Sequence, residues 1–197
     1  MAVSTRFIAL TVIAAAAVGA GTWATMRYLE RPRRGAPPVE AGSPQPAAPS
    51  QNARRIKVTL FYVAKDGMRL AAAERDVLFA EGPSEQGKRI LEALLEPAPA
   101  GLMSAIPPGT TLRGLYVGER GDAYVDFSGS LRQNHPGGSR NEILTVYAII
   151  SALTVNLPAI TSVQILLDGH EVDTLAGHVD LRRPLPNARQ WMEKGTP

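Results

Sequence analysis

The feature that most constrains this chain is a run of twenty residues without a charged side chain, residues 7–26. A helix rises about 1.5 Å per residue, so this run would measure roughly 30 Å, the thickness of the hydrocarbon core of a bilayer. The run follows a short basic end, residues 1–6, whose only charged side chain is Arg6. We therefore expect residues 7–26 to form a transmembrane signal-anchor.

A cleaved signal peptide is the alternative interpretation of the same run. Small residues at 18–20 would suit a cleavage site, but the uncharged run continues beyond them to Met26, which is long for a leader. Trp23 and Tyr28 also lie where an aromatic belt would meet the membrane surface. These features favour an uncleaved anchor, and the absence of cysteine excludes a lipoprotein leader.

Residues 27–55 form a linker that is rich in proline. Such a segment buries little and favours extended polyproline II conformation, so it acts as a semi-rigid spacer. Four arginines lie in its first eight residues, against the single Arg6 before the run. By the positive-inside rule, this imbalance would place the rest of the chain in the cytoplasm.

The remaining residues, 56–197, are sufficient for one domain with a hydrophobic core. Residues 1–55 carry a net charge of +5, whereas residues 56–197 carry −2. Because nucleic-acid binding requires a basic face, this acidic balance argues against a nucleic-acid partner. With no cysteine in the chain, disulfides, thiolate metal sites and cysteine nucleophiles are excluded.

Hydrophobic periodicity predicts strands and helices that alternate along the folded part. Expected strands are residues 55–63, 68–77, 112–117, 123–127, 162–167 and 171–173. One expected helix begins with Ser84 as its cap and ends before Pro97, and the second begins with a capping box of Ser139 and Glu142 and ends before Pro158. The order strand-strand-helix-strand-strand-helix-strand predicts an α+β fold, with a single mixed or antiparallel sheet and both helices on one face.

With these elements assigned, residues 56–185 resemble the GerMN domain, also called the sporulation and spore-germination domain, and residues 186–197 are expected to be a C-terminal tail. No single segment of this resemblance is specific to the family, but the order and spacing of the segments are specific. The carrying segments are residues 60–62, 94–97, 106–110 with Leu112, 124–128, 138–142, 153–158, 163–169 and 177–181. One departure is Asn156, where the family often has an acidic residue.

The resemblance implies an extracytoplasmic domain behind a membrane anchor or lipoprotein leader. It also implies a fold similar to ring-building modules, which are small α+β domains that pack side by side. We give this resemblance more weight than the arginine imbalance, and expect a single-pass protein of the bacterial cytoplasmic membrane with an extracytoplasmic domain, or an exported one if the leader is cleaved. Family members also occur in bacteria that form no spores, so the resemblance does not establish sporulation.

Two groups of polar residues could carry chemistry. Ser128 follows Asp126 at a strand end, but its nearest possible base, His135, lies in a Pro-Gly-Gly loop. We interpret Asp126 and Ser128 as partners of backbone groups where the strand leaves the sheet. A denser cluster includes two histidines, and its spacing fits no closed zinc motif. Its members are Asp168, His170, Glu171, Asp173, His178 and Asp180.

Two further motifs are interpreted as structural. Residues 107–111 lack the lysine and the glycine spacing of a phosphate loop, and Arg182-Arg183 is expected to be a solvated pair. We therefore predict no catalytic, cofactor-binding or metal-binding residue. The positions expected to define the fold are Gly109, Asp126, Ser128, Ser139, Glu142, Asp168 and Gly169.

These observations predict a non-catalytic envelope protein. Residues 7–26 would contact the membrane, and the folded domain would bind itself or another envelope protein through a sheet edge or a helix face. The alternative is a binding protein or enzyme for a small ligand or peptidoglycan, which a pocket lined by Asp126, His135 and His178 would support. A third hypothesis is a fold module that positions a partner and binds nothing strongly alone.

Overall fold

The computed structural model of the chain describes residues 54–192, so the predicted anchor at 7–26 lies outside the described residues. No helix within residues 54–192 has the length and hydropathy needed to cross a membrane. The elements are β1 (Arg55–Val63), β2 (Leu70–Leu78), α2 (Pro83–Leu95), β3 (Leu112–Val117), β4 (Asp122–Phe127), α3 (Ser130–Gln133), α4 (Ser139–Asn156), β5 (Ser162–Leu167), β6 (His170–Glu171), β7 (Leu185–Pro186) and a short 3-10 helix (Arg189–Trp191).

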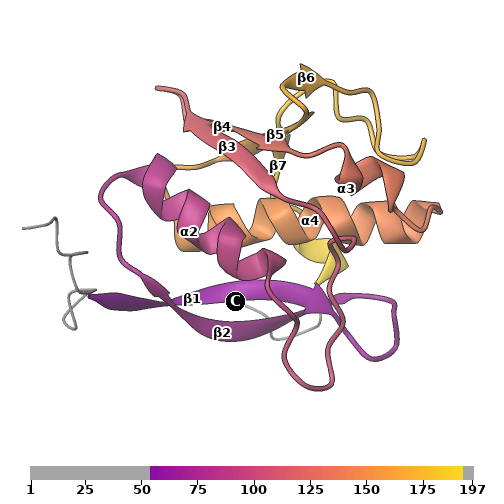
Figure 1. Cartoon of the computed structure of the whole chain (residues 1–197), viewed down its shortest axis with the longest axis horizontal. Helices are drawn as coiled ribbons and strands as arrows, with labels where there is room; N and C mark the ends of the chain where they lie inside the picture. Colours follow the sequence, from indigo (N-terminus) through magenta and orange to yellow (C-terminus); the bar gives the residue numbers. More distant parts are fainter. Residues whose placement is uncertain (1–53, 193–197) are drawn as a thin grey trace, which may run out of the picture. The chain divides into compact units, whose positions relative to one another are not determined.

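The strands form two sheets, and the prediction of a single sheet was therefore wrong. β1 and β2 form an antiparallel pair, whereas the second sheet has the order β3-β4-β5-β6, with β7 also paired to β5. In that mixed sheet β3 and β4 are antiparallel, and β4 and β5 are parallel. Helices α2 and α4 lie between the two sheets, so the described residues form three layers (Figure 1). Both helices do cover one face of the mixed sheet, as predicted.

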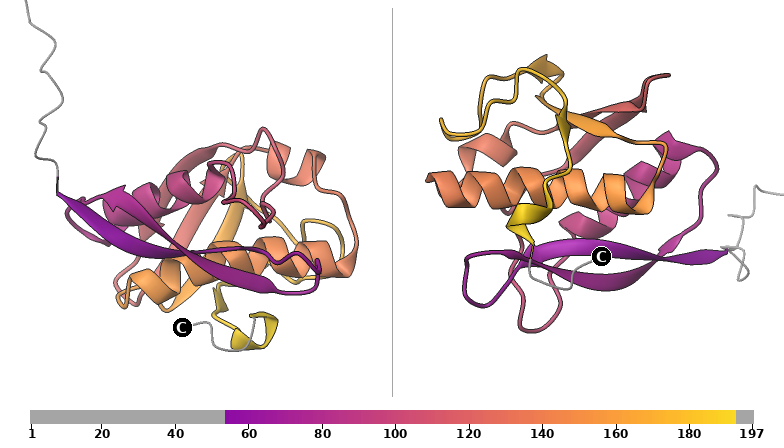
Figure 2. Two further views of the ribbon diagram at one scale, coloured as in Figure 1. Left: turned by 90° about the horizontal axis from the view of Figure 1, so that it is seen from below. Right: turned by 180° about the vertical axis from the view of Figure 1, so that it is seen from behind.

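The two sheets separate because α4 is apolar around most of its circumference. Its buried residues include Leu144 and Val146, and also Ile149, Ile150 and Leu153 in the following turns. A helix that is hydrophobic on nearly all sides must be covered on nearly all sides. One sheet cannot provide this cover, so β1 packs on α4 opposite the mixed sheet, as the views from below and behind show (Figure 2).

Neither helix begins as the sequence predicted. The residue before α2 is Gly82 and the residue before α4 is Gly138, with φ angles of 78° and 82°. No side chain caps either helix, because Ser84 and Ser139 already lie within the first turn. The expected capping box is therefore absent, and Glu142 makes different contacts.

The folded part extends beyond the predicted boundary at Leu185. Met192 is buried and forms an isolated bridge with Leu70 of β2. The ring of Trp191 lies 6.4 Å from that of Tyr147 on α4. The first residues of the expected C-terminal tail therefore pack against the domain.

Candidate functional site

The ends of β3, β4 and β5 meet at a polar corner formed by side chains from all three strands. Asp126 on β4 accepts a hydrogen bond of 2.8 Å from the backbone N–H of Gly169 and one of 3.0 Å from the guanidinium of Arg113 on β3. Ser128 accepts a hydrogen bond of 3.0 Å from the N–H of Thr111. The sequence-predicted residues Asp126, Ser128 and Gly169 thus come together here.

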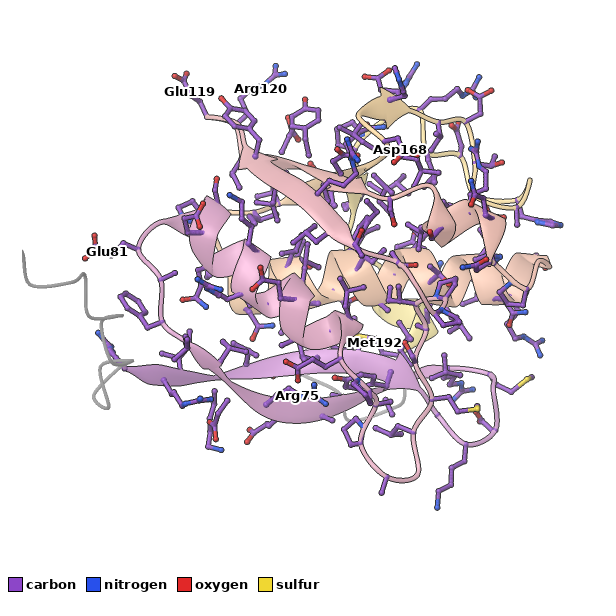
Figure 3. The ribbon with its side chains drawn as sticks, viewed as in Figure 1. Arg75, Glu81, Glu119, Arg120, Asp168 and Met192 are labelled. Atoms are coloured by element: carbon purple, nitrogen blue, oxygen red, sulfur yellow. The ribbon has the colours of Figure 1, made fainter. Side chains whose placement is uncertain are left out.

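Asp168 completes the polar corner from the end of β5 (Figure 3). One of its carboxylate oxygens lies 3.6 Å from Arg113, and the other accepts a hydrogen bond of 3.1 Å from the N–H of Gly129. A Cβ atom at Gly129 would lie 2.6 Å from this carboxylate, so any larger residue there would displace the Asp168 side chain. Asp168 itself has a φ of 51°, which an aspartate tolerates in a tight turn.

The polar corner binds backbone groups and holds no nucleophile paired with a base. The two ring nitrogens of His135 are engaged elsewhere, with the N–H of Gly137 at 3.0 Å and the hydroxyl of Thr145 at 3.3 Å. His135 is therefore not placed to activate Ser128. This geometry agrees with the structural interpretation of Asp126 and Ser128.

Glu142 is a fully buried ionisable side chain. Its exposed fraction is 0%, although it lies in the first turn of α4. Its carboxylate accepts hydrogen bonds of 2.8 Å from the N–H groups of Leu175 and His178, and lies 3.2 Å from the His178 ring. Glu142 therefore holds the loop that follows β6 against the start of α4.

The backbone groups of this loop keep Glu142 ionised. Burial raises the pKa of the Glu142 carboxyl, but backbone N–H donors from Leu175, Ala176, His178 and Val179 outweigh burial, and the net pKa lies below the ordinary value. Sequence reasoning missed this role, although a signal was present. At helical spacing, Glu142 falls on the same buried stripe as Val146, Ile149 and Leu153, where an acid needs internal partners.

A cavity of about 260 Å³ lies between α4 and the loop that precedes β3. Its lining is mainly apolar, with polar groups from Ser104, Asn134, Asn141 and Thr145, and includes no carboxylate or imidazole. Asp126, His135 and His178 make separate contacts, with Gly169, Gly137 and Glu142 respectively. Gly109, another predicted fold-defining position, lies beside Asn134 of the cavity lining, where the chain turns with a φ of 80°.

The acidic and histidine residues after β5 disperse in the fold. Asp180 forms an ion pair with Arg182 at 2.7 Å, and hydrogen bonding from Arg182 lowers the pKa of the Asp180 carboxyl. His170 is exposed on β6, and His178 contacts Glu142. Within residues 54–192, no group of three or more histidine, aspartate or glutamate side chains is arranged to hold a metal ion.

The sheet edges differ in how their backbone groups are satisfied. On β1, Thr59 exchanges hydrogen bonds of 2.8 and 2.7 Å with the side-chain amide of Asn156, and Val63 pairs with Met103. The outer edge of β5 is covered by β6 and β7. Along the described chain, the outer edge of β3 has no such partner.

Comparisons with known proteins identify the family. Residues 59–173 match the family model Germane, described as sporulation and spore germination. The tandem GerMN domains of the sporulation protein GerM from Bacillus subtilis align with 68% of this chain at 21% identity, with a TM-score of 0.55. This chain covers 46% of that tandem structure.

The first GerMN domain of the same Bacillus subtilis protein aligns over 68% of this chain and 98% of its own length, at 20% identity and a TM-score of 0.52. At these identities the likeness shows the fold alone. No curated protein matches the sequence significantly. The sequence-based assignment to GerMN is nonetheless confirmed by the family match, and the chain belongs to the Germane family of sporulation and spore germination domains.

Proposed function

We propose that this chain is a non-catalytic envelope protein whose GerMN domain binds a second copy of itself or another envelope protein. The observation that carries the proposal is the contrast between two kinds of polar group. The side chains that could have carried chemistry, such as Asp126 and Glu142, are engaged with the backbone of their own domain. The backbone along the outer side of β3 has no partner within residues 54–192.

An open sheet edge favours interaction with another chain. Unpaired N–H and C=O groups on an edge strand are a template for further strand pairing. In this proposal, residues 7–26 anchor the chain in the cytoplasmic membrane, and the linker at 27–55 lets the domain reach a partner outside the cytoplasm. Copies that share one membrane meet at a raised effective concentration, so a short contact suffices for assembly.

The full-length chain, expressed in bacterial membranes, tests the proposal in two ways. Retention in the membrane pellet after carbonate washing, together with protease access to the domain from the outer side only, is expected. Sedimentation equilibrium of the chain in density-matched detergent should then give a mass that rises with protein concentration, or the chain should crosslink to an envelope protein. A protein that is released by carbonate, or that stays monomeric and crosslinks to nothing, would contradict the proposal.

The cavity beside Thr145 supports the alternative of a small-ligand binder, because it combines an apolar lining with a few polar groups. Soluble peptidoglycan fragments provide a direct test by titration calorimetry. Saturable heat that is abolished by Thr145→Val, but kept in Thr154→Val on the same helix, would favour this alternative.

A further inference from the structure

The four outer sheet edges of the domain are protected to different degrees. The edge of β1 is bonded at Thr59 by Asn156 and at Val63 by Met103, and the edge of β5 is paired with β7 at its start and with β6 at its end. The edge of β2 carries three consecutive charged residues, Glu74, Arg75 and Asp76, which discourage strand pairing although Lys57 lies 3.7 Å from both carboxylates, and its first residue, Leu70, forms a bridge with Met192. β3 has the sequence LRGLYV, with Arg113 as its only charged residue.

That one charge on β3 is already neutralised within the domain. The guanidinium of Arg113 lies 3.0 Å from Asp126 and 3.6 Å from Asp168. The edge of β3 therefore lacks the free charge by which natural edge strands avoid pairing. A bulge at Arg113 interrupts regular pairing at the start of the strand, so residues 114–117 are the part of this edge suited to contact with another strand.

The hydrogen bonds of the β3–β4 hairpin show which β3 groups face outward. The N–H of Gly118 donates to the C=O of Asp122 at 2.9 Å, so this opposed pair is a hydrogen-bonded one. Hydrogen-bonded pairs alternate along an antiparallel ladder, so Tyr116 and Gly114 also bond to β4. Leu115 and Val117 consequently direct their N–H and C=O groups toward the open side.

The same alternation holds on β1, where the outward-facing residues have partners that confirm it. The N–H of Phe79 donates to the C=O of Arg54, which makes alternate residues from Arg55 onward face outward. Thr59 and Val63 belong to this outward set, and they are the residues that bond to Asn156 and Met103.

The side chains of β3 alternate between two environments. Leu115 is buried toward the helices, whereas Tyr116 is 66% exposed on the outer face, with its ring 6.5 Å from that of Tyr124. Gly114 lies on the same outer face as Tyr116, and a Cβ built on it would meet no atom within 4 Å. The exposed ring of Tyr116 therefore lies on the same face as the open space over Gly114, two residues away in the strand.

We propose that β3 pairs antiparallel with β3 of a second copy, with Leu115 opposite Leu115 of the second copy at a two-fold axis. This inference rests on the proposed function and identifies the contact surface. In this register the outward N–H and C=O groups of Leu115 in one copy bond to those of Leu115 in the other. Both Leu115 side chains stay on the buried face. It also places Tyr116 over Gly114 of the second copy, twice by symmetry.

A second copy fits this edge because the strand is complementary to itself. Pairs that are not hydrogen-bonded bring side chains closest together, and an aromatic residue opposite a glycine covers the exposed backbone of that glycine. The bulge at Arg113 ends the regular ladder there, so the pairing with the second copy is confined to residues 114–117, and the Arg113 side chains, held by Asp126 and Asp168, lie at the two ends of the contact. The contact is isologous, which is the commonest way in which identical chains associate.

Cysteine crosslinking tests the register, because the chain contains no native cysteine. Full-length chains carrying Gly114→Cys and Tyr116→Cys are co-expressed in membranes and oxidised mildly. The disulfide between the two different variants should exceed several-fold the dimer that either variant forms alone. Arg120→Cys, at the exposed hairpin tip (Figure 3), is the control for random collision.

A second measurement uses a substitution that leaves the fold intact. Gly114→Lys points into open space within the domain but displaces Tyr116 of the second copy, and should weaken dimerisation of the detergent-solubilised full chain about tenfold. Glu119→Lys, which changes the charge at the hairpin tip, should leave dimerisation unchanged.

The outcomes separate this inference from the proposed function. Self-association that is unaffected by Gly114→Lys, or equal crosslinking of every variant including Arg120→Cys, would overturn β3 pairing and leave assembly through another surface. A capture of a different envelope protein by the β3 cysteines would also overturn it in favour of a heterologous partner. Absence of any association would contradict both.

Discussion

Glu142 illustrates how the role of a side chain depends on residues distant in sequence. Within its own helix turn it satisfies the pattern of a capping box, yet its bonds go to Leu175 and His178, 33 and 36 residues later. A carboxylate that accepts several backbone N–H groups is stabilised in its charged form, even when it is buried. The loop after β6 is therefore fixed by one anion.

Replacing this anion with its neutral isostere should destabilise the domain. Glu142→Gln keeps the shape but presents an NH2 group to N–H donors, so we expect a loss of about 1–3 kcal/mol in the free energy of unfolding. Urea denaturation measures this loss, and hydrogen exchange at Leu175 and His178 should accelerate. Glu119→Gln, exposed at the hairpin tip, is the matched control and should change stability by less than about 0.5 kcal/mol.

Two glycines provide a second test at the residue scale. Gly129→Ala would place a Cβ atom 2.6 Å from the Asp168 carboxylate, so it should cost about 1–3 kcal/mol of stability by displacing that group from the polar corner. Gly114→Ala meets no atom and should be neutral or slightly stabilising. Thermal melting of both variants measures the difference, and equal melting temperatures would contradict the role assigned to Asp168.

At the scale of elements, polar side chains join neighbouring layers. Asn156 at the end of α4 bonds to both backbone groups of Thr59 on β1 and also donates to the C=O of Ala152. Arg75 on β2 lies beneath α2 (Figure 3) and donates to the C=O groups of Ala93 and Pro97 at the end of that helix. This position places a cation at the negative end of the α2 dipole.

The departure at Asn156 from the acidic residue often found in the family leads to a prediction. Asn156→Asp can accept from Thr59 but cannot donate to Thr59 or Ala152, and it brings a negative charge to two carbonyl oxygens. We expect a loss of about 1–3 kcal/mol, measured by urea denaturation. Asn141→Asp loses one exposed hydrogen bond to the C=O of Gly137 but lies in the first turn of α4, where an acid is favourable, so it should cost less. A similar loss in both variants would contradict the bridging role.

At the scale of the whole domain, the partly buried His135 and the buried Glu142 make stability depend on pH. Burial lowers the pKa of the His135 ring below its ordinary 6.5, and the carboxyl of Glu142 has a pKa below its ordinary 4.5. In both cases the unfolded chain binds a proton more readily than the folded chain does. Stability contributed by His135 is therefore complete above pH 6.5 and declines below it, and that from Glu142 declines only below pH 4.5.

Variants should separate these two pH windows. His135→Gln should remove the part of the loss that begins as the pH falls below 6.5, and Glu142→Gln the part that begins below pH 4.5. The measurement is the free energy of unfolding from urea denaturation across this range, compared with the native chain. A pH profile for His135→Gln that runs parallel to that of the native chain throughout would contradict the assignment.

What the sequence determined is local. Alternation predicted β1, β3 and β5 with the bounds that the structure has, and the apolar stripe of α4 predicted a central helix, because both patterns are properties of neighbouring residues. The family followed from the order and spacing of many such segments. The open or closed state of a sheet edge is not local, and no pattern within β3 revealed it.

Only the tertiary structure decided which surfaces of these elements meet. The split into two sheets depends on cover for both sides of α4, and the partner of Glu142 depends on a loop that returns to the helix start. Such contacts join residues far apart in sequence, and their free energy comes from burial and hydrogen bonding that exist only in the folded chain. For this reason the sequence identified the polar residues, while the fold assigned their partners and left β3 without one.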